Sequence, residues 1–325
     1  MTNLPRGVML DRASLDTGDL DLGPLHAVAD WTLHEATAPE EVTAAIADAA
    51  IVITNKVVLD AEAIRSAPRL RLICVAATGY NNIDLRAAAE RGVVVSNVRG
   101  YATPAVVQHV FALILALSTR LRDYAGLAVD GRWSRSLHFC RLDFPIREIS
   151  GKTLGIVGHG ELGRGVAEVA RAFGMRVLIA ARPGAAAVPE DRIALHDLLP
   201  QVDVLSIHTP LTDRTRKLIG AHELALMKAD ALLINTARGA IVDGAALADA
   251  LRQRLIGGAG IDVVDPEPPP PDHPLLAADI PNLIVTPHVA WASHEARQRL
   301  VDEMAANVRD FLAGRPRNRI EAGPA

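Results

Sequence analysis

The sequence predicts an α/β protein built on two parallel sheets. Short apolar runs alternate with helical stretches over the first hundred residues, as in parallel strands joined by helices. A second series of apolar runs begins near residue 153, directly before a glycine-rich turn. With 325 residues, of which 50% are hydrophobic, the chain can bury two cores.

The first sheet is predicted from four apolar runs, and helices are expected between them. The strands are placed at 7–10, 51–54, 70–75 and 93–96, and the helices near 39–49, 60–67 and 84–91. The polar turn 77–82 follows the third strand. Ligands of open parallel sheets bind beyond the carboxyl ends of the strands, so this turn is a candidate ligand loop. An ordinary strand-to-helix turn is the alternative.

A long apolar helix is predicted over residues 104–118, with Thr103 as its N-cap and Pro104 at its first position. It is apolar nearly all round and too short to span a bilayer, so it should pack between domains or subunits. We place the start of the second domain here. Residues 122–150 show little periodicity, and no element is predicted for them.

A glycine-rich turn follows the apolar run 153–157 and precedes a stretch with helical spacing. Gly158 and Gly160 allow the backbone to approach a pyrophosphate, and the helix N-terminus offers N–H groups to its charge. Gly163 lets the helix lie close to the strand. The flanking strand and helix therefore favour a dinucleotide site over a purely structural glycine turn.

Five further strands are expected at 176–181, 203–208, 231–236, 259–264 and 282–286, with helices at 244–256 and 294–313. The proline-rich run 265–271 must be an ordered loop or a rigid spacer. Ionisable side chains follow three of the strands, namely Arg238, Glu267 and His288. Strand ends of an open sheet share one edge, so these side chains can converge beside the glycine turn. Taken singly, each could be a solvated turn residue, a loop charge or a satisfied imidazole.

Composition and motifs exclude several function classes. The formal net charge of −4, without a basic cluster, predicts no nucleic-acid or membrane partner. Cys74 and Cys140 have no metal-like spacing, and residues 1–30 contain no signal-peptide pattern, so a cytoplasmic location is expected. We expect no metal site, because neither His222-Glu223 nor His294-Glu295 is followed by the second histidine of a zinc protease. No serine-nucleophile elbow occurs either.

Together these segments resemble the D-isomer-specific 2-hydroxyacid dehydrogenase family over nearly the whole chain. The matching motifs are, in the family's order and spacing, 158–163, 209–212, 235–239, 260–263 with Glu267, and 286–288. Residues 53–56, 76–84, 103–108 and 288–291 make the chain most similar to glycerate dehydrogenases, or hydroxypyruvate reductases, within it.

The resemblance implies a Rossmann dinucleotide-binding domain, residues 100–290, inserted into a flavodoxin-like substrate domain of residues 1–99 and 291–325. It also implies closure of the two domains over the active site and a homodimer that the apolar helix helps to form. The implied activity is hydride transfer between NAD(P)H and a small 2-keto acid such as hydroxypyruvate or glyoxylate. The alternative is a catalytically idle protein of this fold that senses redox state or controls assembly.

The resemblance also assigns residue roles. His288 is the acid that protonates the carbonyl oxygen, Glu267 is its partner, and Arg238 holds the substrate carboxylate. These roles suit the chemistry, because a carboxylate favours a protonated imidazole and the guanidinium fork matches a keto acid. Further substrate contacts are implied for Lys56, Thr78 and Gly79. The implied cofactor contacts are Thr103, Gly158, Gly160, Glu161, Leu162, Gly163, Arg182, Thr209, Pro210, Thr236, Ala237 and Asp262, the last to the nicotinamide carboxamide.

The second strand of the cofactor domain departs from the family pattern. It ends in Ala181-Arg182-Pro183, where NAD-dependent members carry an acidic residue that binds the ribose hydroxyls. Arg182 can instead pair with the 2′-phosphate of NADP. The sequence therefore favours NADPH over NADH, and the alternative is that Arg182 points to solvent and both cofactors are accepted.

Overall fold

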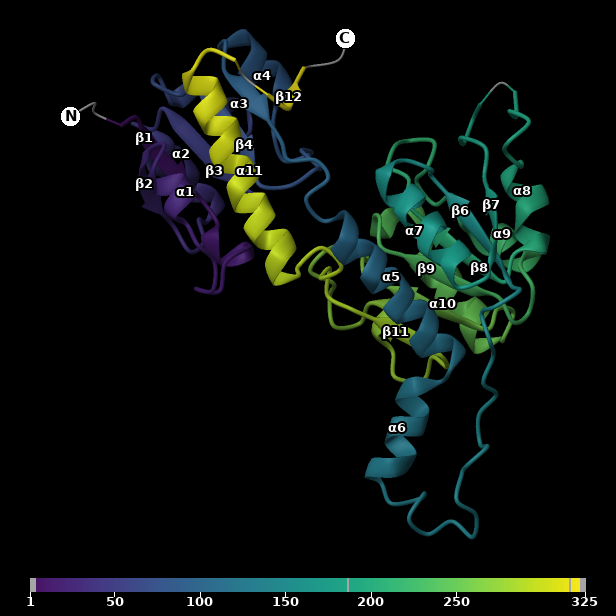
Figure 1. Cartoon of the computed structure of the whole chain (residues 1–325). Coiled ribbons are helices and arrows are strands. Elements are labelled where there is room, and N and C mark those ends of the chain that lie inside the picture. The colour runs from purple at the N-terminus through teal and green to yellow at the C-terminus, as the bar shows by residue number, and fades with distance from the viewer. Residues whose placement is uncertain (1–3, 186, 316, 322–325) are drawn as a thin grey trace. The chain divides into compact units, whose positions relative to one another are not determined.

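The computed structural model describes residues 4–185, 187–315 and 317–321. The chain folds as two compact units (Figure 1). We call Met1–Ala102 with Trp291–Ala325 the split unit, and Thr103–Ala290 the inserted unit. Each unit contains a six-stranded sheet.

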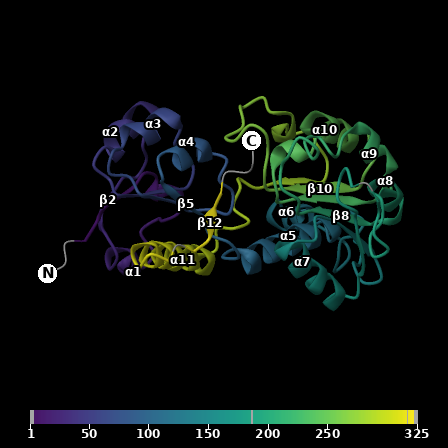
Figure 2. The ribbon, with the colours of Figure 1, turned by 90° about the horizontal axis from the view of Figure 1, so that it is seen from above.

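The sheet of the split unit has the strand order β12-β5-β4-β3-β1-β2, and all its strands are parallel except β12. Figure 2 shows α2, α3 and α4 on one face of this sheet and α1 and α11 on the other. Asp60, Asp84 and Ser293 cap α3, α4 and α11 by accepting a bond from an amide in the first turn. The bounds are β1 Arg6–Met9, β2 Asp30–Leu33, β3 Ile51–Thr54, β4 Leu72–Val75, β5 Val94–Ser96, β12 Arg319–Ile320, α1 Gly23–His26, α2 Val42–Ile46, α3 Ala61–Ser66, α4 Leu85–Glu90 and α11 His294–Leu312, with short 3-10 helices at Arg12–Ser14 and Pro39–Glu41.

The predicted strands of this sheet are present, but β2, β12 and α1 were not expected. Strand β3 is buried along its whole length, and its apolar run is visible in the sequence. Strand β2 lies at the sheet edge, and its residues alternate between exposed and half-buried. An edge strand of this kind carries no apolar run, so its sequence does not indicate a strand.

The sheet of the inserted unit is entirely parallel, with the order β11-β10-β9-β8-β6-β7. The order reverses direction between β6 and β8, which is where dinucleotides bind in folds of this type. Helices α8, α9 and α10 cover one face and α5 and α7 the other (Figure 2). The bounds are β6 Thr153–Val157, β7 Arg176–Ile179, β8 Val204–Ile207, β9 Leu232–Asn235, β10 Gly258–Ile261, β11 Leu283–Val285, α5 Thr103–Ser118, α6 Leu121–Val129, α7 Glu161–Ala172, α8 Leu195–Leu198, α9 Ala221–Leu226 and α10 Gly244–Arg252, with 3-10 helices at Leu199–Gln201, Gly239–Ile241 and Pro274–Leu276.

The apolar helix α5 begins at Thr103, one residue earlier than predicted. Thr103 is thus the first helical residue and not the N-cap that the sequence predicted, and its hydroxyl donates to Glu161 Oε1 at 2.6 Å. The helix packs on α7 and on β9, β10 and β11 of its own unit. Much of its apolar surface is therefore buried without a second domain or subunit, which explains why it is apolar on several faces.

Residues 121–149, which we call the projecting arm, contain α6 and a long loop. Figure 1 shows the arm extending away from the sheet of the inserted unit. Several of its large apolar side chains are exposed, including Leu137 at 97% and Phe139 at 91%. No single described helix is long and apolar enough to cross a membrane. Helices α5 and α6 together have the length and apolar composition of a membrane span, but they are bent by 63° to one another.

Candidate active site

The glycine turn of the inserted unit joins β6 to α7 and lies against the end of β8. Gly158 has φ +94°, and a side chain there would meet the carbonyl carbon of His208 at 2.6 Å. A Cβ on Gly163 would lie 2.1 Å from the carbonyl oxygen of Gly158. A Cβ on Gly160 would have no described atom of another part of the chain within 4 Å. Two glycines therefore permit close packing, and the third leaves room for a pyrophosphate at the start of α7.

The charge around this turn suits an anionic ligand. His159 lies between the first two glycines, and its pKa is lowered first by partial burial and then by the positive charges of Arg192, Arg164 and Arg171. These arginines make the environment of the turn electropositive. A bound phosphate group would be stabilised by the same charges.

Two buried polar atoms at the same sheet edge lack partners. Among the described residues, neither His208 Nδ1 nor Thr236 Oγ1 has a hydrogen-bond partner. His208 follows β8 and Thr236 follows β9. An unpaired buried polar atom is costly, so both positions fit contact with a bound polar molecule. His208 was not predicted as a site residue, although it directly precedes Thr209.

His208 has a consequence for stability that can be measured. Burial lowers its pKa to about 4, so below about pH 6.5 the unfolded chain binds a proton here that the folded chain does not. The contribution of neutral His208 to the free energy of unfolding is therefore fully present above pH 6.5. It is lost as the pH falls towards 4. Between pH 7 and 5 we expect a loss of about 2 kcal/mol.

The measurement is calorimetric unfolding at both pH values without added cofactor. His208→Gln can still bond Ser206, which lies 2.8 Å from Nε2 in the native protein, but it does not titrate. We expect the variant to lose less of its unfolding temperature between pH 7 and 5. Equal losses in both proteins would show that His208 is not responsible.

Arg238, Glu267 and His288 follow the adjacent strands β9, β10 and β11 of the inserted unit. Glu267 Oε2 lies 2.7 Å from His288 Nδ1, and Glu267 Oε1 accepts the amide of Val264 at 3.1 Å. His288 has φ +54°, and its amide donates to the carbonyl of Asp262 at 2.8 Å. Backbone bonds therefore fix both members of the histidine–glutamate pair.

Asp262 anchors the segment that carries His288. Asp262 is 1% exposed, and its carboxylate accepts the amides of Val289 and Ala290, each at 2.9 Å. The Asp262 carboxylate also accepts a hydrogen bond from the hydroxyl of Thr286 at 2.5 Å. The oxygen of that hydroxyl lies 3.0 Å from His109 Nε2. The resemblance implies a nicotinamide contact for Asp262, but the structure shows a carboxylate already engaged by its own chain. The part played by His109 was missed, because it lies in an apolar helix far away in sequence.

Arg238 is half-buried in a turn that Asn235 shapes. The Asn235 side chain donates to the Arg238 carbonyl at 3.0 Å and accepts the Ala237 amide at 3.0 Å. A Cβ at Gly239 would lie 2.0 Å from the carbonyl carbon of Val264, so the turn packs directly on the segment that leads to Glu267. Arg238, the candidate for binding the substrate carboxylate, and the histidine–glutamate pair thus belong to adjoining loops.

The remaining predicted cofactor contacts also lie in the inserted unit. The amide nitrogen of Thr209 is 2.6 Å from where a Gly158 Cβ would stand, so Thr209 and Pro210 begin directly beside the glycine turn. Arg182 is exposed just after β7. The side chain of Arg214 lies against Gly184 in the loop that follows.

Lys56, Thr78 and Gly79 lie in the split unit, after the adjacent strands β3 and β4. The buried carboxylate of Asp11 accepts the amides of Asn55 and Lys56, at 2.9 and 2.6 Å, and so shapes the loop after β3. Asp11 was missed, because its target loop is more than forty residues away.

Comparisons with known proteins identify the family of this chain. The family model of the D-isomer specific 2-hydroxyacid dehydrogenase, NAD binding domain, matches residues 111–290. The chain belongs to this family. It is 45% identical over 97% of its length to a glycerate dehydrogenase of Methylorubrum extorquens, of which it covers 98%. It is 36% identical over 96% of its length to a hydroxypyruvate reductase of Blautia hydrogenotrophica, of which it covers 98%.

A solved structure extends the likeness to a cofactor complex. The NADPH-dependent glyoxylate/hydroxypyruvate reductase of Sinorhizobium meliloti, solved with NADP and malonate, has a TM-score of 0.81 and 27% identity. The alignment covers 97% of this chain and 96% of that one. This 2-hydroxyacid dehydrogenase is therefore an oxidoreductase that exchanges a hydride between NAD(P)H and a small 2-keto acid. None of these relatives supports the catalytically idle alternative.

Proposed function

We propose that the enzyme reduces hydroxypyruvate and glyoxylate to D-glycerate and glycolate, with His288, Glu267 and Arg238 as its catalytic set. The observation that carries the proposal is the pairing of His288 Nδ1 with Glu267 at 2.7 Å, on the loop adjoining that of Arg238. The names of the two curated relatives support the choice of substrate.

In this mechanism the bound cofactor supplies a hydride to the carbonyl carbon. Arg238 holds the substrate carboxylate through its planar fork and polarises the neighbouring carbonyl. As negative charge develops on the carbonyl oxygen, His288 Nε2 donates the proton that completes the hydroxyl group. Glu267 keeps Nδ1 paired, which orients the ring for the transfer.

The experiment is turnover of NADPH and NADH with a panel of small 2-keto acids. We expect the highest kcat/KM with hydroxypyruvate or glyoxylate. Pyruvate is a matched comparison, because it differs from hydroxypyruvate only by one hydroxyl group. Absence of turnover across the whole panel with either cofactor would contradict the proposal.

Further contacts follow from the same proposal. The amides of Thr78 and Gly79 bind the substrate carboxylate, and Lys56 borders its variable end. Asp262 acts mainly by anchoring the His288 segment, in addition to the nicotinamide contact that the family implies. The pyrophosphate and ribose contacts are Thr103, Gly158, Gly160, Glu161, Leu162, Gly163, Thr209, Pro210, Thr236 and Ala237.

We further propose that the enzyme prefers NADPH. Arg182 is exposed in the loop that follows β7, and the Arg214 side chain lies against Gly184 of the same loop, so this loop has two guanidinium groups that suit a 2′-phosphate. The solved relative that binds NADP is described as NADPH-dependent. A clear preference for NADH in wild-type kcat/KM would contradict this assignment.

Ala181→Asp tests the preference by adding repulsion. Ala181 is 9% exposed and lies two residues after β7, where we expect a carboxylate to approach the ribose. We expect the ratio of kcat/KM for NADPH to that for NADH to fall by at least about tenfold, because the new charge opposes the phosphate. Asn at the same position is the control, since it has similar size without the charge.

We also propose that the enzyme is a homodimer whose second copy covers the projecting arm. Leu137, Phe139 and Leu142 are each at least 85% exposed, an arrangement that a monomer rarely maintains. A Leu137→Glu/Phe139→Glu variant should elute as a monomer in light-scattering chromatography, while the wild type elutes as a dimer. A monomeric wild type at micromolar concentration would overturn the proposal.

We infer a cytoplasmic location. Cys74 is buried, Cys140 is half-buried, and both are free thiols. A reducing compartment keeps such thiols free. Subcellular fractionation of the native protein tests the inference, and recovery in an oxidising compartment would contradict it.

A further inference from the structure

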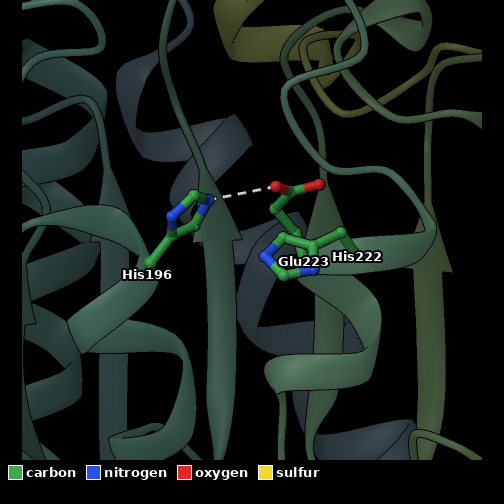
Figure 3. Close-up of side chains that lie close together, drawn as sticks. All are labelled: His196, His222 and Glu223. Carbon is green, nitrogen blue, oxygen red and sulfur yellow. Dashed lines mark hydrogen bonds and ion pairs between the residues drawn. The ribbon is translucent and has the colours of Figure 1, made fainter.

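A cluster of two histidines and one glutamate lies on the inserted unit, on the helical layer formed by α8 and α9. Figure 3 shows His196 on one helix facing Glu223 on the other, with His222 beside them. One ligand atom from each side chain lies within 4.8 Å of the others. The catalytic proposal uses none of these residues. We propose that His196, His222 and Glu223 bind a divalent transition-metal ion of the Zn²⁺ class.

The three side chains stand on well-anchored backbone. Leu198 of α8 and Leu224 of α9 are fully buried in the same hydrophobic core, which fixes both short helices. Both histidines are exposed above that core. Glu223 Oε2 accepts the Gly220 amide at 3.0 Å, which orients the carboxylate and directs its other oxygen to His196. A carboxylate held by a backbone bond is a positioned ligand, as in known metal sites.

The distances are close to those that a metal ion requires. A zinc ion with bonds of about 2.0–2.1 Å holds tetrahedral ligand atoms roughly 3.4 Å apart. His196 Nε2 is already 3.1 Å from Glu223 Oε1. The widest pair of ligand atoms must close by roughly 1 Å or a little more, which rotation of an exposed imidazole provides.

The donor set selects the class of ion. Two imidazoles and one carboxylate suit Zn²⁺, Cu²⁺ and Ni²⁺, whereas Mg²⁺ and Ca²⁺ prefer oxygen ligands. Three protein ligands leave the last tetrahedral position to water.

The alternative is an ordinary surface pair of His196 with Glu223, which would contribute little. That pair does not require a second imidazole, but the ring of His222 lies 5.3 Å from that of His196, at 89° to it. The third side chain is what makes the cluster a metal site and not only an ion pair.

Binding would cross-link α8 and α9, which are separated by more than twenty residues. An ion that binds only the folded chain stabilises it in proportion to its concentration. Zn²⁺ should therefore raise the unfolding temperature, independently of any effect on hydride transfer.

The experiment is calorimetric titration of Zn²⁺ into the chelator-treated full chain. We expect a binding event that weakens by at least about tenfold in His196→Ala and in His222→Ala. Glu223→Gln keeps an oxygen for the Gly220 amide and removes the charge, so it should also weaken binding while α9 stays capped. His26→Ala, at an exposed histidine of the split unit, is the matched control and should bind as the wild type does.

A second measurement identifies the ligands directly. Cu²⁺ bound to the wild type should show nitrogen splitting from two imidazoles in its electron paramagnetic resonance spectrum, and His222→Ala should show one fewer. Zn²⁺ affinity that is equal in the wild type and both histidine variants would overturn the proposal. So would the absence of Zn²⁺ binding by the wild type.

Discussion

Replacing His288 with Ala should lower kcat by about two decades or more with hydroxypyruvate, while the affinity for NADPH changes little. We expect this loss because the variant lacks the group that we propose as the proton donor to the carbonyl oxygen. The proposed cofactor contacts lie mainly on other loops of the inserted unit, so we expect their geometry to be retained. Single-turnover reduction followed by NADPH absorbance measures the chemical step, and NADPH fluorescence titration measures cofactor affinity.

Glu267→Gln provides a graded comparison. Glutamine still offers an oxygen to the Val264 amide, which Glu267 accepts at 3.1 Å in the native protein. It removes the charge beside His288 Nδ1, so kcat should fall by less than in His288→Ala. A His288→Ala enzyme that keeps kcat within a factor of about three would remove His288 from the role of acid.

The parallel order of strands made much of the site predictable. Arg238, Glu267 and His288 each follow an apolar run, and parallel strands end at one sheet edge. The glycine turn was equally visible, because Gly158 is required locally by a positive φ and Gly163 by close packing. Local patterns of this kind can be read from one segment at a time.

Groups that act across long sequence separations were not predictable in this way. Asp262, Thr286 and His109 form one network, but His109 lies 177 residues from Thr286. His196 lies 27 residues from Glu223, and the spacing rules that we applied to His222-Glu223 consider only one helix. Our expectation of no metal site considered local spacing alone, whereas the site that we propose takes a second histidine from another helix.

Arg238 is the other position where we expect a large effect. Its planar guanidinium group would make two charge-assisted hydrogen bonds to the substrate carboxylate. Each such bond contributes about 1.5–3 kcal/mol of binding free energy. Arg238→Ala should therefore lower kcat/KM by about two to four decades. Both kcat and KM should change, because Arg238 would interact with the bound keto acid and with the charge that develops in the transition state.

Arg238→Lys separates charge from geometry. Lysine keeps the positive charge but loses the planar fork, so kcat/KM should fall between the values of the wild type and Arg238→Ala. The turn itself should survive, since the Asn235 side chain bonds backbone atoms of Ala237 and Arg238 that both variants retain. Arg238→Ala removes one further bond, from Arg238 Nη1 to the Ala237 carbonyl at 2.7 Å. Steady-state kinetics over a range of hydroxypyruvate concentrations measures kcat and KM, with Arg216→Ala as a control at a nearby exposed arginine. If Arg238→Ala leaves both constants unchanged, Arg238 does not contact the substrate, and the histidine–glutamate pair must act with another cation.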